Sequence, residues 1–114
     1  MARASTPPTE FNATVKIDHY NNELANATNN NFPLRYLVNA QYYNSSQGPI
    51  LFYTGNEGDI YAFYNMSGFI TDTLAKKLGA LVVFCEHRWY GTSYPFGNAT
   101  EAKKNENLKY LTVP

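Results

Sequence analysis

Two short runs of large apolar residues constrain the fold of this 114-residue chain more than any other feature. Ile50–Tyr53 and Ala80–Phe84 are apolar throughout, which is typical of strands that are covered on both faces. Between them, apolar residues recur at every fourth position, as on one face of a helix: Ile70, Leu74 and Leu78. Gly79 then suits a left-handed helix cap. Because parallel strands need a crossover connection, residues 49–86 are predicted to form one parallel strand–helix–strand unit.

The segments before this unit show a different pattern. Val15–Tyr20 and Leu34–Tyr43 alternate apolar and polar residues, as strands covered on one face do. The Asn-rich stretch 21–31 has the composition of a loop, so the two segments are predicted to pair as antiparallel strands. Residues 1–10 lack periodicity and contain two prolines, and we expect them to be a disordered tail. The remaining residues, 11–114, are predicted to form part of a single domain.

Composition and charge exclude two classes of partner. Nine Lys and Arg residues balance nine Asp and Glu residues, so the chain lacks the basic surface that nucleic-acid binding requires. The apolar runs are far shorter than the roughly 18 to 20 residues that span a bilayer, so no membrane span is predicted. A hydrophobic content of 44% with 16% charged residues is typical of a globular chain.

Asn-X-Ser/Thr acceptor sites for N-glycosylation are unusually frequent. Five occur, at Asn12, Asn26, Asn44, Asn65 and Asn98. The frequencies of Asn, Ser and Thr predict about two by chance, which favours a glycoprotein of the secretory pathway, either lysosomal or secreted. The alternative is that an Asn-rich chain collects such triplets without function. The first eight residues lack the apolar stretch of a signal peptide, so either the signal has been removed or the chain is partial.

Polar segments follow both predicted parallel strands at their carboxyl ends, where ligands bind in open parallel sheets. In Thr54–Asp59, Gly55 and Gly58 permit backbone conformations that turn N–H groups toward a ligand. The alternative is a tight turn with solvated carboxylates. After the second strand come three ionisable side chains in a row, Glu86, His87 and Arg88. They line a cleft or, in the alternative interpretation, Glu86 and Arg88 form a structural ion pair.

Other chemistries lack their sequence signals. One cysteine, Cys85, and two distant histidines have no metal-ligand spacing, and no phosphate-binding loop is present, so neither a metal nor a cofactor is expected. Ser93 lies in Gly-Thr-Ser-Tyr-Pro, where proline replaces the last glycine of a nucleophile elbow, so we interpret it as non-catalytic. Because Cys85 ends an apolar run, a buried and unreactive thiol is predicted.

Three sequence motifs make the family of the chain recognisable: Ile50–Ile60, Glu86–Gly91 and Ser93–Gly97. They resemble the serine peptidase family of lysosomal Pro-X carboxypeptidase, dipeptidyl peptidase II and thymus-specific serine peptidase. The resemblance extends from about Ile17 to Leu111. It departs from the residues usual in the family at Leu34, Trp89 and Thr92.

The resemblance implies the N-terminal part of an α/β-hydrolase fold, truncated before the nucleophile strand. In its strand order, Ala80–Glu86 is enclosed between two strands, whereas Ile50–Thr54 lies at an edge. The triad would lie beyond Pro114, so the chain alone is expected to be inactive. Its contribution would be an oxyanion-hole donor from the loop formed by Gly55, Asn56, Glu57 and Gly58.

The implied activity is that of a serine-type exopeptidase acting on peptides with proline near the cleaved end. Glu57 or Asp59 would bind a substrate ammonium in an aminodipeptidase, and Arg88 would bind a carboxylate in a carboxypeptidase. The sequence leaves this choice and the oligomeric state open. The alternative function is a non-catalytic secreted glycoprotein module, in which a surface rich in the 10 tyrosines binds sugar or protein.

Overall fold

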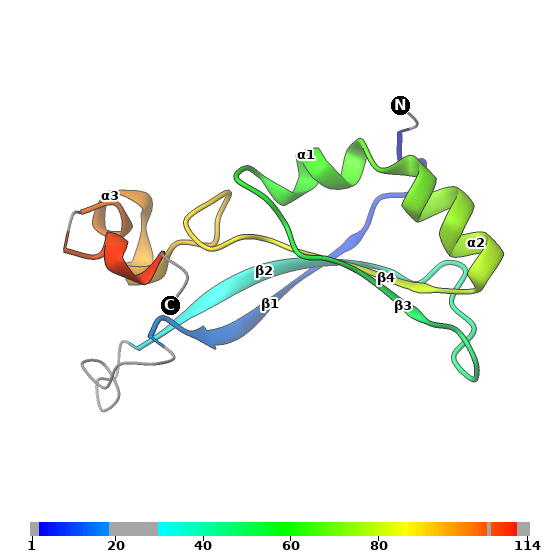
Figure 1. Cartoon of the computed structure of the whole chain (residues 1–114), viewed down its shortest axis with the longest axis horizontal. Helices are drawn as coiled ribbons and strands as arrows, with labels where there is room; N and C mark the ends of the chain where they lie inside the picture. Colours follow the sequence, from blue (N-terminus) through cyan, green and yellow to red (C-terminus); the bar gives the residue numbers. More distant parts are fainter. Residues whose placement is uncertain (1–2, 19–29, 105, 112–114) are drawn as a thin grey trace.

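The chain folds around a single four-stranded sheet in the residues that the computed structural model describes, which are 3–18, 30–104 and 106–111. The strands are β1 (Thr9–Lys16), β2 (Asn31–Asn39), β3 (Ile50–Tyr53) and β4 (Leu81–Cys85). Their order in the sheet is β1-β2-β4-β3 (Figure 1). The β3–β4 pair is parallel, and the other two pairs are antiparallel.

The predicted mixed α/β architecture is confirmed. Ile50 is paired with Leu81 and Tyr53 with Phe84, so the two apolar runs are adjacent parallel strands. β4 lies between β2 and β3, which leaves β3 at an edge of the sheet. This is the order expected for the enclosed and the exposed apolar strand.

Two helical segments connect β3 to β4. The first, α1 (Ile60–Asn65), is capped by Asp59, whose side chain accepts the Tyr61 N–H. A π-helical turn, η2 (Phe69–Leu74), then continues into α2 (Ala75–Leu78). The left-handed cap predicted at Gly79 is confirmed by its φ of 63°. The helix α1 was not predicted. No helix in the described ranges has the length and apolar character to cross a bilayer.

The N-terminal strand differs from its prediction. β1 begins at Thr9, within the stretch expected to be a disordered tail, and pairs along its whole length with β2. Residues before it are also bonded, because the Ala4 N–H donates to the Asn65 carbonyl and the Ser5 N–H to Asp72. β1 has no fully buried residue, and its first two residues, Thr9 and Glu10, are polar and exposed like the stretch before them, so the start of the strand was not predicted. Residues 19–20 of the predicted strand lie outside the described residues.

The C-terminal part is built from short helical turns. They are η3 (Pro95–Gly97), α3 (Ala99–Ala102) and η4 (Leu108–Tyr110), which lie together beyond one end of the sheet in Figure 1. The Asn98 side chain caps α3 by accepting the Glu101 N–H.

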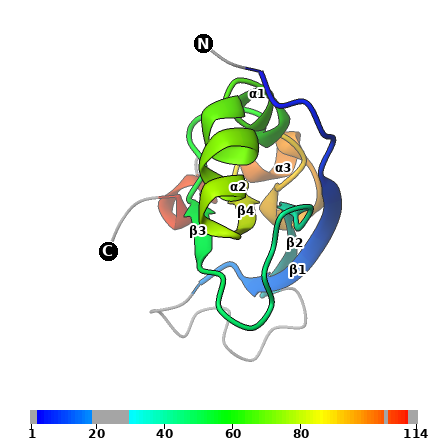
Figure 2. The same ribbon diagram turned by 90° about the vertical axis from the view of Figure 1, so that its right-hand side faces the viewer.

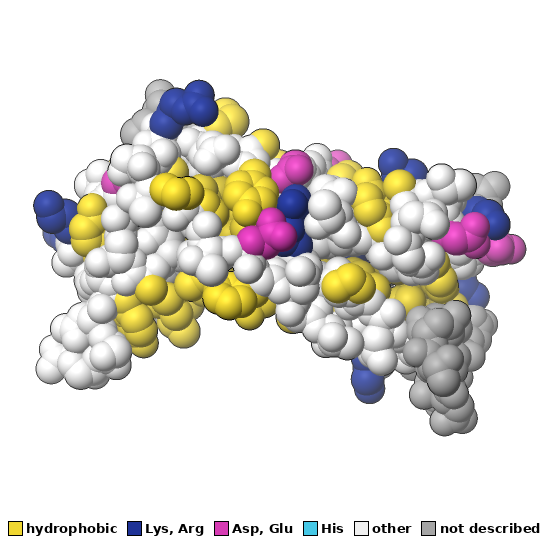
Figure 3. Space-filling model, turned by 180° about the vertical axis from the view of Figure 1, so that it is seen from behind, with side chains coloured by type: hydrophobic (Ala, Val, Ile, Leu, Met, Phe, Trp, Pro, Cys, Tyr) yellow, Lys and Arg dark blue, Asp and Glu magenta, His cyan; other side chains and the backbone are white. Residues whose placement is uncertain are grey.

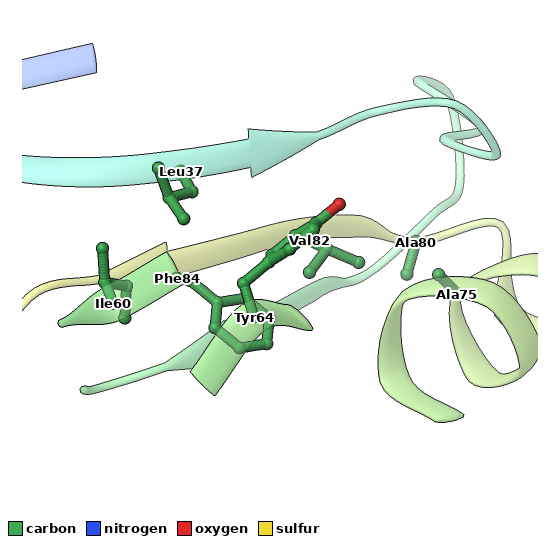
Figure 4. Close-up of a cluster of buried hydrophobic side chains, with 7 residues drawn as sticks. All are labelled: Leu37, Ile60, Tyr64, Ala75, Ala80, Val82 and Phe84. Carbon is green, nitrogen blue, oxygen red and sulfur yellow. The ribbon is translucent and has the colours of Figure 1, made fainter. Parts of the chain in front are cut away.

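The core lies between the sheet and the helical layer. Its buried members come from β2, α1, α2, β4 and the connection between α2 and β4 (Figure 4): Leu37, Ile60, Tyr64, Ala75, Ala80, Val82 and Phe84. The Tyr64 and Phe84 rings meet edge to face with centroids 5.2 Å apart. The Tyr64 hydroxyl donates to the Thr6 carbonyl and accepts from Asn39, and burial raises its pKa. The core therefore joins the predicted parallel unit to β2 and the N-terminal segment.

The opposite sheet face and the β3 edge carry exposed apolar side chains. Both helices of the crossover lie on one side of the sheet (Figures 1 and 2). Apolar side chains are visible along the other side, at the lower margin of Figure 3. On β3, Ile50 and Phe52 are 60% and 58% exposed. The radius of gyration, 16.1 Å, exceeds the about 13 Å expected for a compact domain of this length.

We expect Phe52→Lys to reduce self-association of the 114-residue chain. A charge on an unpaired edge strand discourages pairing with other chains, and Phe52 is exposed. Sedimentation velocity over a concentration series measures the effect. The free energy of unfolding should change by no more than about 0.5 kcal/mol.

The matched control is Leu51→Lys. Leu51 is half-buried and packs against the core, so this substitution should lower the free energy of unfolding by about 2 kcal/mol. A wild-type chain that stays monomeric at all concentrations would show that the β3 edge does not drive association.

Candidate functional site

The two polar segments predicted at the carboxyl ends of β3 and β4 lie against one another. Gly55 has a φ of 79° and rests on the backbone of the β4 end. A Cβ atom at this position would collide with the Cys85 carbonyl and would lie 2.9 Å from the His87 nitrogen. Only glycine therefore allows the loop to approach β4 so closely.

The loop after β3 has two backbone N–H groups that its own hydrogen bonds do not use. The Glu57 N–H donates to the Asn56 side chain at 2.8 Å, and the Gly58 N–H donates to the Asn56 carbonyl at 2.8 Å. Among the described residues, no acceptor is found for the N–H groups of Gly55 and Asn56. These two amides are the donors that the loop can offer to a ligand.

A buried ion pair lies directly behind this loop. Glu86, at the end of β4, has a side chain that is 0% exposed, and that of Arg35 on β2 is 8% exposed. The guanidinium binds both carboxylate oxygens, with Nε 3.2 Å from Oε1 and Nη2 2.7 Å from Oε2. Burial alone would lower the pKa of Arg35, but the hydrogen bonds and charges of Glu86 and Asp59 outweigh it and raise the pKa.

Glu86 also accepts hydrogen bonds from two other segments. Its Oε2 accepts the Ile60 N–H at the start of α1, at 3.0 Å. Its Oε1 accepts the Thr92 N–H at 3.1 Å and the Ser93 hydroxyl at 2.8 Å. One carboxylate therefore links β2, α1 and the turn after β4. Removing one partner of such a buried pair typically costs about 3 to 5 kcal/mol.

The alternative of a Glu86–Arg88 ion pair is wrong, because the partner of Glu86 is Arg35. Arg88 turns away from the helical layer. It donates to three main-chain carbonyls, at 2.6 to 3.0 Å, of Lys16, Ile17 and Tyr110. Burial lowers the pKa of Arg88. Its guanidinium thus ties the end of β1 to the C-terminal turns.

The other predicted site residues differ in the number of hydrogen bonds and ion pairs that their side chains make. Asp59 accepts from Arg35 and from the Tyr61 N–H, both at 2.9 Å. In the described part of the chain, the exposed Glu57 side chain has no hydrogen bond or ion pair. His87 Nδ1 lies 2.7 Å from the Arg88 carbonyl oxygen. Acidic and basic side chains adjoin near the middle of the surface in Figure 3.

The surroundings of Ser93 and Cys85 favour structural roles for both side chains. The buried Ser93 hydroxyl donates to Glu86 and accepts the Arg35 N–H at 2.9 Å. Cys85 is only half-buried, and burial, followed by the charge of Glu86, raises the pKa of its thiol. Across the described residues, no three His, Cys, Asp or Glu side chains gather as a metal site requires.

Arg35 is the site residue that sequence reasoning missed. It alternates with Leu37 and Asn39 on the face of β2 that meets the helices. A charge on a buried face requires a partner of opposite sign. The sequence did not mark this face as buried, because Arg35 falls among the polar positions of the alternating segment Leu34–Tyr43, and its partner Glu86 follows the adjacent strand β4.

Four glycosylation acceptor asparagines are exposed, at Asn12, Asn44, Asn65 and Asn98. Asn26 lies outside the described residues. Asn44 is in the turn after β2, and its side chain accepts from both the N–H and the hydroxyl of Ser46.

Comparisons with known proteins identify relatives of the chain. The family model described as serine carboxypeptidase S28 matches residues 15–114. Human lysosomal Pro-X carboxypeptidase is 46% identical over 97 residues, which are 85% of this chain and 18% of that protein. Prolyl carboxy peptidase like protein 5 of Caenorhabditis elegans is 57% identical over 67 residues, covering 59% of this chain and 13% of that protein. A putative serine protease of the same nematode is 37% identical over 111 residues, covering 97% and 18%. The chain thus spans less than a fifth of the length of these relatives.

We expect Gly91→Ala to disrupt the site through the Glu86 carboxylate. Gly91 has a φ of 57°, and an added Cβ would collide with the Glu86 carboxylate. Positive φ and overpacking together should lower the free energy of unfolding by about 3 kcal/mol, as measured by urea denaturation.

Gly97→Ala is the matched control. Gly97 has a φ of 92°, but nothing lies within 4 Å of an added Cβ. Only the backbone strain of about 1 to 2 kcal/mol should remain. Equal losses in the two variants would contradict the placement of Glu86 against Gly91.

Proposed function

Because this chain belongs to the serine carboxypeptidase S28 family, we propose that it is the N-terminal portion of a serine-type exopeptidase with an α/β-hydrolase fold. The observation that carries the proposal is the family match over residues 15–114. The strand order β1-β2-β4-β3 supports the fold, because it leaves β3 free to receive a further strand.

The loop after β3 is assigned to the oxyanion hole. When a serine attacks a peptide carbonyl, the oxygen becomes negative, and backbone N–H groups stabilise it. The N–H groups of Gly55 and Asn56 are the candidate donors, since Asn56 already accepts those of Glu57 and Gly58. One such donor contributes about 2.7 to 4 kcal/mol to the transition state in a working enzyme.

The proposed substrate is a peptide with proline near the cleaved end, following the name of the human Pro-X carboxypeptidase. If the enzyme instead removes N-terminal dipeptides, Glu57 is the stronger ammonium ligand. Its carboxylate is exposed, whereas that of Asp59 is already bound by Arg35. Arg88 remains the candidate carboxylate ligand only if it releases main-chain carbonyls. The contacts therefore support Glu57 as an ammonium ligand in a dipeptidase better than they support Arg88 as a carboxylate ligand in a carboxypeptidase.

The nucleophile is proposed to come from outside this chain, so the 114-residue chain alone should not react with a fluorophosphonate serine probe. Ser93 is its elbow-like serine, and the hydroxyl is buried and donates to Glu86. A chimera in which the chain replaces the matching segment of human lysosomal Pro-X carboxypeptidase should be labelled and should cleave Pro-X peptides.

The unaltered human enzyme is the positive control. Labelling is measured by intact mass and peptide mapping. Stoichiometric modification of Ser93 in the isolated chain would contradict the proposal, as would a folded chimera without activity.

We further propose that the protein is a glycoprotein of the lysosome or the secretory pathway. The exposure of four acceptor asparagines supports this, together with the lysosomal name of the human relative. Expressed behind a signal sequence, the chain should carry glycans at Asn44 and Asn98, since turns expose their side chains to modification.

Glycosidase treatment and peptide mapping measure the occupancy. Ser46→Ala and Thr100→Ala remove the two acceptor sites, and Thr100→Ala leaves Asn98 in place as the cap of α3. Each should abolish one glycan. Secreted material with both asparagines unmodified would count against this localisation.

A further inference from the structure

We propose that Arg35 and Glu86 are positioning residues that hold the loop Gly55–Gly58 with the free N–H groups of Gly55 and Asn56 in a fixed arrangement. The proposal rests on the oxyanion role assigned to this loop. Neither residue would touch a substrate, because the Glu86 side chain is fully buried and that of Arg35 is nearly so. They would act on the reaction through the backbone that they support.

Both ends of the loop are fixed by the end of β4. At its start, Gly55 rests on the backbone around Glu86. At its end, the Ile60 N–H donates to Glu86 Oε2, and Asp59 binds Arg35. The loop therefore begins against the main chain at the end of β4 and ends on the ion pair itself, through Ile60 and Asp59.

The middle of the loop has little other support. Asn56 and Glu57 are exposed, and the bonds of their backbone lie within the loop itself. Their position depends on the two attached ends. A displacement of about 1 Å at a catalytic donor can cost a factor of 100 in rate, so the rigidity of these attachments matters to the chemistry.

The arginine determines the orientation of the carboxylate. Oε2 faces α1, where it accepts the Ile60 N–H, and Oε1 faces the turn, where it accepts from Thr92 and Ser93. A planar guanidinium that binds both oxygens fixes the carboxylate plane, and a lysine ammonium cannot do so. Arg35→Lys is consequently an informative variant, because it keeps the charge but loses the two-point contact.

The test compares Glu86→Gln and Arg35→Lys with Asn39→Ala in the 114-residue chain. Asn39 lies on the same face of β2 and bonds Tyr64, away from the loop. The measurement is the ¹⁵N order parameter of each amide. We expect values for residues 55–58 to fall from about 0.85 toward 0.6 in the two site variants, while β2 and β4 keep theirs. Asn39→Ala should leave the loop unchanged.

The same variants in the chimera give a functional readout. Glu86→Gln and Arg35→Lys should lower kcat about 10- to 100-fold with KM nearly unchanged, because an oxyanion donor acts in the transition state. Asn39→Ala should leave both constants unchanged. An unaltered loop, or a raised KM at constant kcat, would overturn the proposal. An inactive parent chimera would instead refute the proposed function, and the order parameters would still decide the positioning role.

Discussion

The buried pair of Arg35 and Glu86 is the interaction on which the site depends. It joins β2 to the end of β4, and through Glu86 it also holds the start of α1 and the turn that contains Ser93. A carboxylate without exposure is stable only when its oxygens are satisfied, and here each oxygen has more than one donor. The arrangement therefore specifies where four segments of the chain meet, in addition to any stability that it contributes.

Geometry around this pair explains which small residues the site requires. Gly91 leaves space for the carboxylate, and Gly55 allows the loop after β3 to reach the backbone of β4. The polar network and the apolar core are adjacent, because Ile60 donates its N–H to Glu86 while its side chain is part of the core cluster. Packing of the helical layer and positioning of the loop are consequently coupled.

Much of the architecture could be predicted from sequence. The parallel strands β3 and β4 are continuous runs of apolar residues, and Gly79 marks the end of the helix that connects them. The order of the strands followed from the family resemblance. The start of β1 could not be placed, since Thr9 and Glu10 are polar and exposed and resemble the stretch that precedes them. In the site, Glu86 and Arg88 suggested a pair by proximity in sequence, but Arg35 is nearer in space. Contacts across the sheet are invisible to local spacing.

The position of β4 between β2 and β3 also affects how the chain is made. During synthesis, β2 and β3 leave the ribosome before the strand that separates them. At about 5 to 20 residues per second, the ladder groups of β2 and β3 that face β4 wait unpaired on the order of seconds. β2 and β3 are consecutive in the chain, joined by residues 40–49, so a non-native pairing between them has no strand in its way during this time. The β2–β4 and β3–β4 pairs can form only after Cys85 has emerged, so this part of the sheet closes late in synthesis.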